Sequence, residues 1–319
     1  MRTRSLRNLI KRCVFLSLGS KVAVARRISH IAESGKSIIL NLHRVAEPDS
    51  SASPALDPTL FEELLVFLQK DFHIVPLDAL DERTCRPKVV LSFDDGYRDF
   101  IEVTAPILDK FRIRANQNII PRCIETGLPP LTVIARDFIG KAPPAVVRSV
   151  HAPGFGPLEP TESCSSSLAD FIKSKSQEKQ EEIFDVLYRQ YTIEESFQPT
   201  LMMTKEDVRQ ISLYHEVGAH SFTHASMGAE TDDYFRSDLH KCREYMQTEL
   251  GLPMSIYAFP NGSYRHSQLT IALESGLRHV LLVDNDFAGN SSIHPRFGFD
   301  AAILSEVRFK ALGGLRKAN

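Results

Sequence analysis

Two adjacent carboxylates, Asp94 and Asp95, come directly after the apolar run VVLSF at 89–93 and are followed by Gly96. Neighbouring carboxylates at the end of a strand can take different roles, because one can bind a metal ion while the other accepts a proton from water. A plain turn is the alternative, since Asp-Gly is a common turn dipeptide. This motif alone leaves both interpretations open.

Two histidines, His220 and His224, form the second group, in the segment HSFTH after the run EVGA at 216–219. The i, i+4 spacing predicts that both side chains face the same side of one helical turn, which suits imidazole nitrogens that bind one cation. Such pairs also arise by chance. Two histidines and one carboxylate with open positions are typical of a catalytic site for zinc or another divalent transition metal.

The elements that must position these residues follow from the alternation of short apolar runs with amphipathic helical patterns. This order predicts an α/β fold with a parallel sheet or barrel, in which loops at the carboxyl ends of the strands carry the active site. A third strand end, YAFPNG at 257–262, would lie at the same pole. The expected strands are 37–42, 72–76, 88–93, 117–120, 217–219, 255–259 and 280–283.

Residues 140–200 interrupt this alternation. Five prolines and a serine-rich tract come first, and residues 168–191 then show the pattern of one long charged helix. We expect an inserted helical subdomain or lid at about 140–200. The predicted domains are a basic N-terminal helical segment at 1–35 and an (β/α) domain at 36–319 that contains the insertion.

The composition is that of an ordinary globular protein: 319 residues, 43% hydrophobic and 24% charged, with a net charge of −2. This small net charge hides an uneven distribution. Residues 1–30 carry eight Lys or Arg and no acid, so the rest of the chain is acidic. Such a segment suits peripheral contact with an anionic membrane; a solvated basic helix is the alternative. No apolar run is long enough to span a bilayer.

Five scattered cysteines without a C-x-x-C pair indicate neither a disulfide framework nor a thiolate zinc site. We therefore expect a cytoplasmic protein or one peripheral on the inner membrane, with the periplasm as the alternative. Nucleic acid is not an expected partner, because the sequence shows no aromatic platform or recognised motif.

The motifs LSFDDG (91–96), HSFTH (220–224) and AFPNG (258–262), in this order, resemble those of the polysaccharide deacetylase family, the NodB-homology carbohydrate esterases. The segment LNLHRV (40–45) resembles the opening strand of the family, and residues 203–224 resemble the helix before its histidine pair. The resemblance runs from about residue 37 to residue 300. It implies an irregular, partly open (β/α) barrel.

The resemblance also implies metal-dependent hydrolysis of acetyl groups on a cell-surface or precursor polysaccharide, with N-acetyl groups as the favoured substrate. Asp95, His220 and His224 would bind a divalent metal, with zinc as the first choice, and Asp94 would be the general base. The Arg that often orients this base is missing from the third motif, and Arg296 could replace it. The usual general acid, a histidine near the end of the chain, has no clean match; His294 is the nearest candidate.

His43 is a second candidate for the pocket.

Two other functions remain open. One is a catalytically impaired glycan-binding or scaffold protein of a polysaccharide assembly system, favoured by the uncertain acid and the missing Arg. The other is a phosphatase with an Asp-rich strand end, which the two histidines fit poorly because magnesium sites prefer oxygen ligands.

Overall fold

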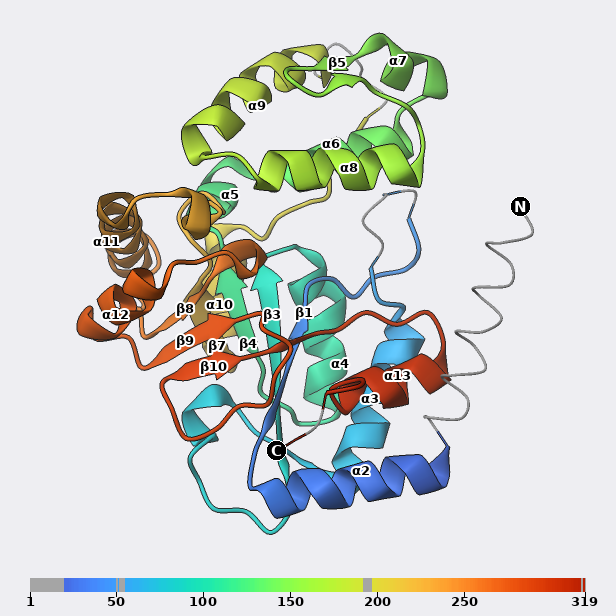
Figure 1. Ribbon diagram of the computed structural model, residues 1–319, viewed down its shortest axis with the longest axis vertical. Coiled ribbons are helices and arrows are strands. Elements are labelled where there is room, and N and C mark those ends of the chain that lie inside the picture. Colours follow the sequence, from blue (N-terminus) through green and yellow to red (C-terminus); the bar gives the residue numbers. More distant parts are fainter. Residues whose placement is uncertain (1–19, 50, 52–54, 192–196, 317, 319) are drawn as a thin grey trace.

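The computed structural model describes residues 20–49, 51, 55–191, 197–316 and 318. Eight parallel strands follow one another in the order β10-β9-β8-β7-β4-β3-β1-β11, and β2 pairs with β3 beside them. Figure 1 shows the helices around this sheet. The strands are β1 (Ile38–Leu42), β2 (His73–Ile74), β3 (Lys88–Asp95), β4 (Asn116–Ile119), β7 (Glu216–Ala219), β8 (Ile256–Ala258), β9 (His279–Leu282), β10 (Ile293–Pro295) and β11 (Phe297–Gly298).

One short segment joins the two edges of the sheet. β10 pairs with β9 and β11 pairs with β1, while only Arg296 separates β10 from β11 in the chain. The sheet therefore forms a nearly closed (β/α) barrel, as the sequence predicts.

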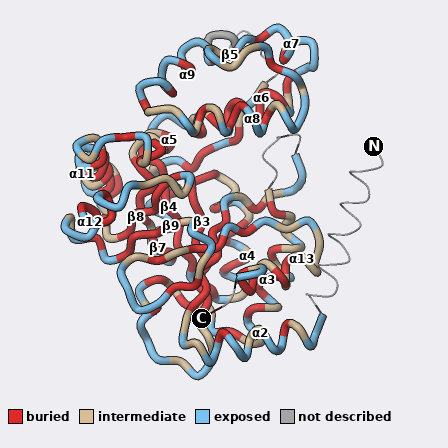
Figure 2. The backbone as a smooth tube through the Cα atoms, viewed as in Figure 1, coloured by how far each residue is buried: buried red, intermediate tan, exposed pale blue. Residues whose placement is uncertain are grey.

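Strand residues alternate between two apolar clusters because successive side chains point to opposite faces of a strand. Val89 and Leu91 of β3 pack outward against the helices, whereas Val90 packs with Ile39 and Leu281 inside the barrel. Most of the central strands are buried along almost their whole length, as Figure 2 shows for β3 and β4. Burial on both faces explains the continuous apolar sequences of β1 and β9.

Helices cover the outside of the barrel. α3 buries Phe61, Leu64, Leu65 and Leu68, and Asp57 caps its amino end by accepting from the N–H groups of Thr59 and Leu60. The surrounding helices are α2 (Lys21–Ser34), α3 (Pro58–Asp71), α4 (Ala105–Lys110), α10 (Lys205–Ser212), α11 (Asp232–Thr248), α12 (His266–Glu274) and α13 (Leu304–Ala311), with the short helices η1 (Leu77–Ala79), η2 (Phe100–Thr104), η3 (Met227–Ala229) and η4 (Pro260–Gly262) between them.

A separate group of elements follows β4, with its own apolar core that includes Phe138, Leu168 and Ile172. It stands apart from the barrel in Figure 1. It contains α6 (Leu131–Lys141), α7 (Pro144–Ser149), β5 (His151–Ala152), β6 (Gly156–Pro157), α8 (Glu162–Lys173) and α9 (Gln177–Tyr191). The short helix α5 (Pro121–Thr126) connects β4 to this group, and its Ile124 belongs to the main core of the barrel. The expected single helix at 168–191 is wrong: the chain breaks between α8 and α9, where the Ser174 hydroxyl bonds back to the carbonyl of Phe171.

The described part of the basic N-terminal segment packs on the barrel. Val24 and Ile31 of α2 join the main core, and the Arg27 Nε donates to the carbonyl oxygen of Leu312 at 2.8 Å. The rest of the predicted segment, residues 1–19, lies outside the described residues. Among the residues that the structure describes, no helix combines the length and apolarity needed to cross a bilayer.

Candidate active site

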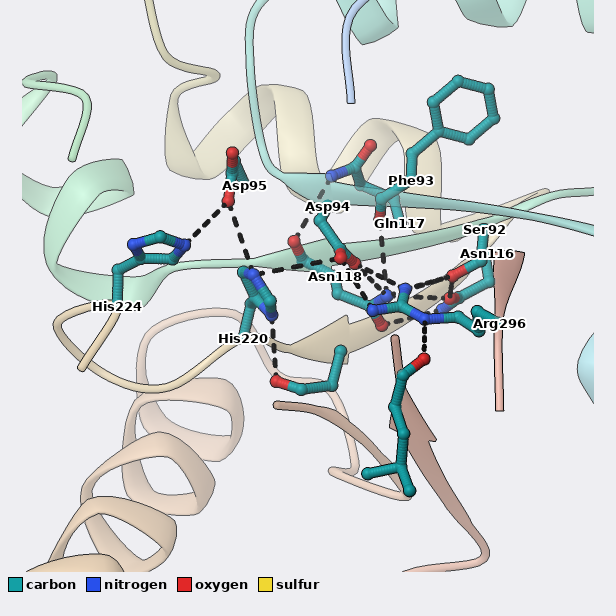
Figure 3. Close-up of polar contacts among 12 residues, drawn as sticks. Ser92, Phe93, Asp94, Asp95, Asn116, Gln117, Asn118, His220, His224 and Arg296 are labelled. Atoms are coloured by element: carbon teal, nitrogen blue, oxygen red, sulfur yellow. Dashed lines mark hydrogen bonds and ion pairs between the residues drawn. The ribbon is translucent and has the colours of Figure 1, made fainter. Parts of the chain in front are cut away.

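Asp95, His220 and His224 meet at the carboxyl ends of β3 and β7 (Figure 3). The Asp95 Oδ1 atom lies 3.5 Å from Nε2 of His220 and 3.4 Å from Nε2 of His224. One potential ligand atom from each residue lies within 4.8 Å of the others. The structure thus brings together the three residues that the sequence analysis selected as metal ligands.

The two histidines converge through a loop, and the expected helical turn is wrong. Ser221 and His224 have φ angles of 60° and 66°, in the left-handed region that such residues seldom adopt. The buried carboxylate of Asp238 holds this loop: its Oδ1 accepts from the Ser221 hydroxyl and from the Phe222 N–H, both at 2.9 Å. The spacing of four residues brings the imidazoles together by a different backbone path than the one predicted.

The donor set fits a divalent metal. Asp95 Oδ1 is buried and has no hydrogen-bond partner among the described residues, while Oδ2 accepts from the Tyr97 hydroxyl at 2.7 Å. The His220 Nδ1 lies 2.9 Å from the Ala258 carbonyl oxygen. This contact requires a proton on Nδ1 and leaves the Nε2 lone pair on the side of Asp95, which is the arrangement that metal-binding histidines show.

The charge states also suit a metal. Burial lowers the pKa of His224 to about 3, so its imidazole is neutral near pH 7. Burial raises the pKa of Asp95, but the charges of the nearby histidines lower it by a larger amount in total. The pKa therefore lies below its ordinary value, and the carboxyl stays ionised. Neutral imidazoles and a carboxylate are the forms that bind metal ions.

Asp94 forms an ion pair with Arg296 through two hydrogen bonds. The Arg296 Nη1 and Nη2 donate to Oδ1 and Oδ2 of Asp94, each at 2.8 Å, and Asn118 Nδ2 donates to Oδ1 at 2.8 Å. Burial raises the pKa of Asp94, but the charge and hydrogen bonds of Arg296, together with the charges of His220 and His43, outweigh this effect and hold the pKa well below its usual range. Oδ2 lies 3.9 Å from Nε2 of His220, so the ionised carboxylate faces the histidine site.

The sequence analysis missed the polar residues inside the barrel that support this ion pair. Ser92 Oγ donates to Asn116 Oδ1 at 2.7 Å and accepts from Arg296 Nη1 at 2.9 Å. A Cβ on Gly218 would lie 2.3 Å from Oδ1 of Asn118, so only glycine leaves room there. Polar residues at alternate positions of β3 and β4, in runs that must be buried, are the signal that could have identified them.

The two candidate acids lie in different places. His43 is exposed and lines the same cavity as Asp94 and Asp95. His294 is buried, and its Nε2 lies 3.0 Å from Nδ1 of His279, whose Nε2 lies 3.2 Å from Asp78. His279 begins β9, so this chain of contacts leads to the opposite end of the barrel. His294, which the sequence offers as the nearest candidate for the general acid, is not among the residues that line the cavity.

A cavity of about 1040 Å³ opens above the histidine site. Its walls come from the barrel loops on one side and from α6 and α8 on the other. This volume is large enough for more than one sugar ring. The carboxylates, the histidines and the space for a substrate are therefore in one place.

Comparisons with known proteins point to one family. The polysaccharide deacetylase family model matches residues 171–280, which include the histidine pair but not the Asp94–Asp95 motif. No curated protein matches the sequence.

Three solved structures share the fold. IcaB from Ammonifex degensii has a TM-score of 0.57 at 14% identity, covering 87% of this chain and 97% of that chain. The Streptococcus pyogenes deacetylase PplD in complex with acetate has a TM-score of 0.55 at 16% identity, covering 83% and 92%. The de-N-acetylase from Aggregatibacter actinomycetemcomitans has a TM-score of 0.52 at 15% identity, covering 83% and 95%. The resemblance to the polysaccharide deacetylase family, predicted from three short motifs, is therefore confirmed by the family model and by the fold.

Proposed function

We propose that this protein is a metal-dependent hydrolase that removes acetyl groups from a cell-surface or precursor polysaccharide, with N-acetyl groups as the favoured substrate. The observation that carries the proposal is the pairing of two neighbouring sites: a carboxylate–histidine–histidine set with an unpartnered Asp95 oxygen, and an ionised Asp94 beside it. The names of the structural relatives, a deacetylase and a de-N-acetylase, support the reaction class.

Asp95, His220 and His224 would hold the metal, and zinc is the first to test because this mixed imidazole and carboxylate set suits it. When bound, a divalent cation supplies polarisation of the acetyl carbonyl and a lower pKa for water.

Asp94 is the proposed general base. Arg296 and Asn118 keep it ionised and fix the directions of both oxygens, so it can accept the proton of the attacking water without rearrangement. We assign the general acid to His43, because it lines the cavity and can approach a leaving amine. The proton gained by the departing nitrogen would then come from a group at the open side of the site.

The test is acetate release from acetylated oligosaccharides by the full chain loaded with zinc. We expect release that stops with a chelator, returns with added metal and falls at least 100-fold in Asp94→Asn. His220→Ala should lose the bound metal by elemental analysis, whereas His240→Ala, on the exposed side of α11, should keep it. A chain that binds no divalent metal would contradict the proposal.

The alternative, a glycan-binding or scaffold protein without turnover, is distinguished by the same assay. Glycan binding with unchanged acetyl content, retained in Asp94→Asn, would support it. We also propose contact of residues 1–30 with an anionic membrane, on the basis of their charge, and a location in the cytoplasm or on the inner membrane, on the basis of the cysteine pattern.

A further inference from the structure

The acidic side chains that line the outer part of the cavity already have partners. Asp57 caps α3. Lys310 binds both Asp300 at 2.7 Å and Glu306 at 2.9 Å. Asp49 lies 3.6 Å from Arg44 and 3.4 Å from Lys141. Asp57 is thus satisfied by backbone N–H groups and the other three carboxylates by Lys or Arg side chains, all within the protein itself.

Two cations on the opposite wall have no such partner. Arg136 of α6 and Lys173 at the end of α8 line the cavity and are partly buried. Neither side chain forms a hydrogen bond or ion pair with another residue in the described part of the chain. Arg44, the third cation of the cavity, differs from them because its Nε binds Asp99 at 2.7 Å.

Arg136 and Lys173 are also close enough to repel each other. α6 and α8 pack side by side (Figure 1). The pKa of Lys173 is lowered, first by burial and then by the charge of Arg136, while Asp95 and Asp170 act weakly in the opposite direction. Two half-buried like charges that share one wall carry a cost that a bound anion removes.

Lys173 connects this wall to the reaction centre. It lines the large cavity together with Asp95 and His224, and it also lines a second, smaller cavity of about 130 Å³ together with His224 and Asn261. An anion held by Lys173 would therefore lie in the same cavity as the histidine site.

We propose that Arg136 and Lys173 form an anion subsite that binds a carboxylate or phosphate group of the glycan, next to the sugar that loses its acetyl group. The guanidinium can bind two oxygens of such a group at once, and the ammonium adds a compact charge. The inference rests on the proposed deacetylase function and deepens it, because it makes the preferred substrate an acidic polysaccharide.

The test compares three sets of acetylated oligosaccharides of equal length: neutral, with uronate carboxylates, and with phosphate groups. Binding is measured by calorimetry with the metal-loaded full chain that carries Asp94→Asn, so that turnover does not interfere. We expect the parent to bind one anionic set at least tenfold more tightly than the neutral set. This preference should fall at least tenfold in Lys173→Met and in Arg136→Gln.

Two matched variants control for loss of charge. Lys175→Met removes a lysine whose Nζ lies 4.4 Å from the Phe171 ring centre, and Arg148→Gln removes an arginine paired with the exposed Glu159. Both should keep the preference. The uronate and phosphate arms show which anion the subsite takes.

Equal binding of neutral and anionic sets by the parent, or a preference that survives both Lys173→Met and Arg136→Gln, would overturn the inference. Acetate release is measured in parallel with the unmutated protein. Release without charge preference contradicts the subsite alone, whereas charge-dependent binding without any release supports the subsite and contradicts the proposed hydrolysis.

Discussion

Arg296 and Asp94 are 202 residues apart in the sequence and form a two-bond ion pair with both N–O distances at 2.8 Å. Neither side chain is more than 1% exposed. The arginine belongs to the segment that closes the barrel, and the aspartate ends β3. The carboxylate proposed as general base is thus oriented by the closure of the fold itself.

Replacement of Arg296 should separate charge from orientation. Arg296→Lys keeps a positive charge but cannot bind both carboxylate oxygens in one plane, so we expect kcat to fall by about 10- to 100-fold with little change in KM. Arg296→Gln leaves a buried carboxylate unpaired and should lower the free energy of unfolding by about 3–5 kcal/mol. Steady-state kinetics and urea denaturation check both.

The control for Arg296 is Arg278→Gln, because Arg278 forms an exposed ion pair with Asp78. Its loss should change stability by less than about 1 kcal/mol. A lysine variant at position 296 with the parent kcat would show that orientation of Asp94 is not needed.

Replacement of each of the two candidate acids should affect kcat differently. His43→Gln removes a histidine that lines the cavity, and we expect kcat to fall by about 100-fold or more. His294→Gln changes a histidine at the other end of the barrel, and kcat of the folded variant should stay within about threefold. A larger kcat loss in the second variant than in the first would return the assignment to His294.

The Asp94 pKa predicts how stability depends on acid. The folded pKa lies well below its usual range, while the unfolded value is 3.8. Asp94 therefore stabilises the fold above pH 3.8, and this contribution is lost as the pH falls through and below that value. Between pH 5 and pH 3, the metal-free parent should lose about 1 kcal/mol more stability than Asp94→Asn. The check is the free energy of unfolding of both proteins, from chemical denaturation at each pH. An equal loss in the two proteins between pH 5 and pH 3 would rule this prediction out.

Gly218 should tolerate no side chain. Alanine would place its Cβ 2.3 Å from Oδ1 of Asn118 and 2.8 Å from Cγ2 of Ile256, inside a packed barrel. We expect Gly218→Ala to destabilise the fold by about 1–3 kcal/mol and to lower kcat, because the displaced Asn118 also binds Asp94. Gly289→Ala, where no atom lies within 4 Å of the added Cβ, is the matched control and should leave both quantities nearly unchanged.

The sequence predicts the strands best where they are continuous apolar runs, as in β1, β3 and β9, whereas the short strands β10 and β11 were not expected. The expected strand at 88–93 is β3, which continues to Asp95, and the one at 217–219 is β7. Asp95, His220 and His224 could be identified for a related reason: they directly follow such runs, and parallel strands bring their carboxyl ends to one pole.

Other parts of the site depend on contacts that no local pattern records. Asn118 points at Asp94 only because β4 pairs with β3, and Asp238 reaches the histidine loop from α11. The helical turn expected for His220 and His224 fails for the same reason, since Asp238 holds the loop in another conformation. His294 was selected from its position in the sequence, which says nothing about its depth in the barrel.

The place of Arg296 in the chain has a consequence for biosynthesis. On the ribosome, the proposed metal ligands at 95, 220 and 224 emerge well before residue 296. Until β10 and β11 join the nascent barrel, Asp94 has no cationic partner, and a buried unpaired carboxylate opposes compaction of that part of the sheet. Synthesis of the last strand segment therefore completes the barrel and orients the proposed base, so a chain that stops before it would lack the ion pair of Asp94 with Arg296.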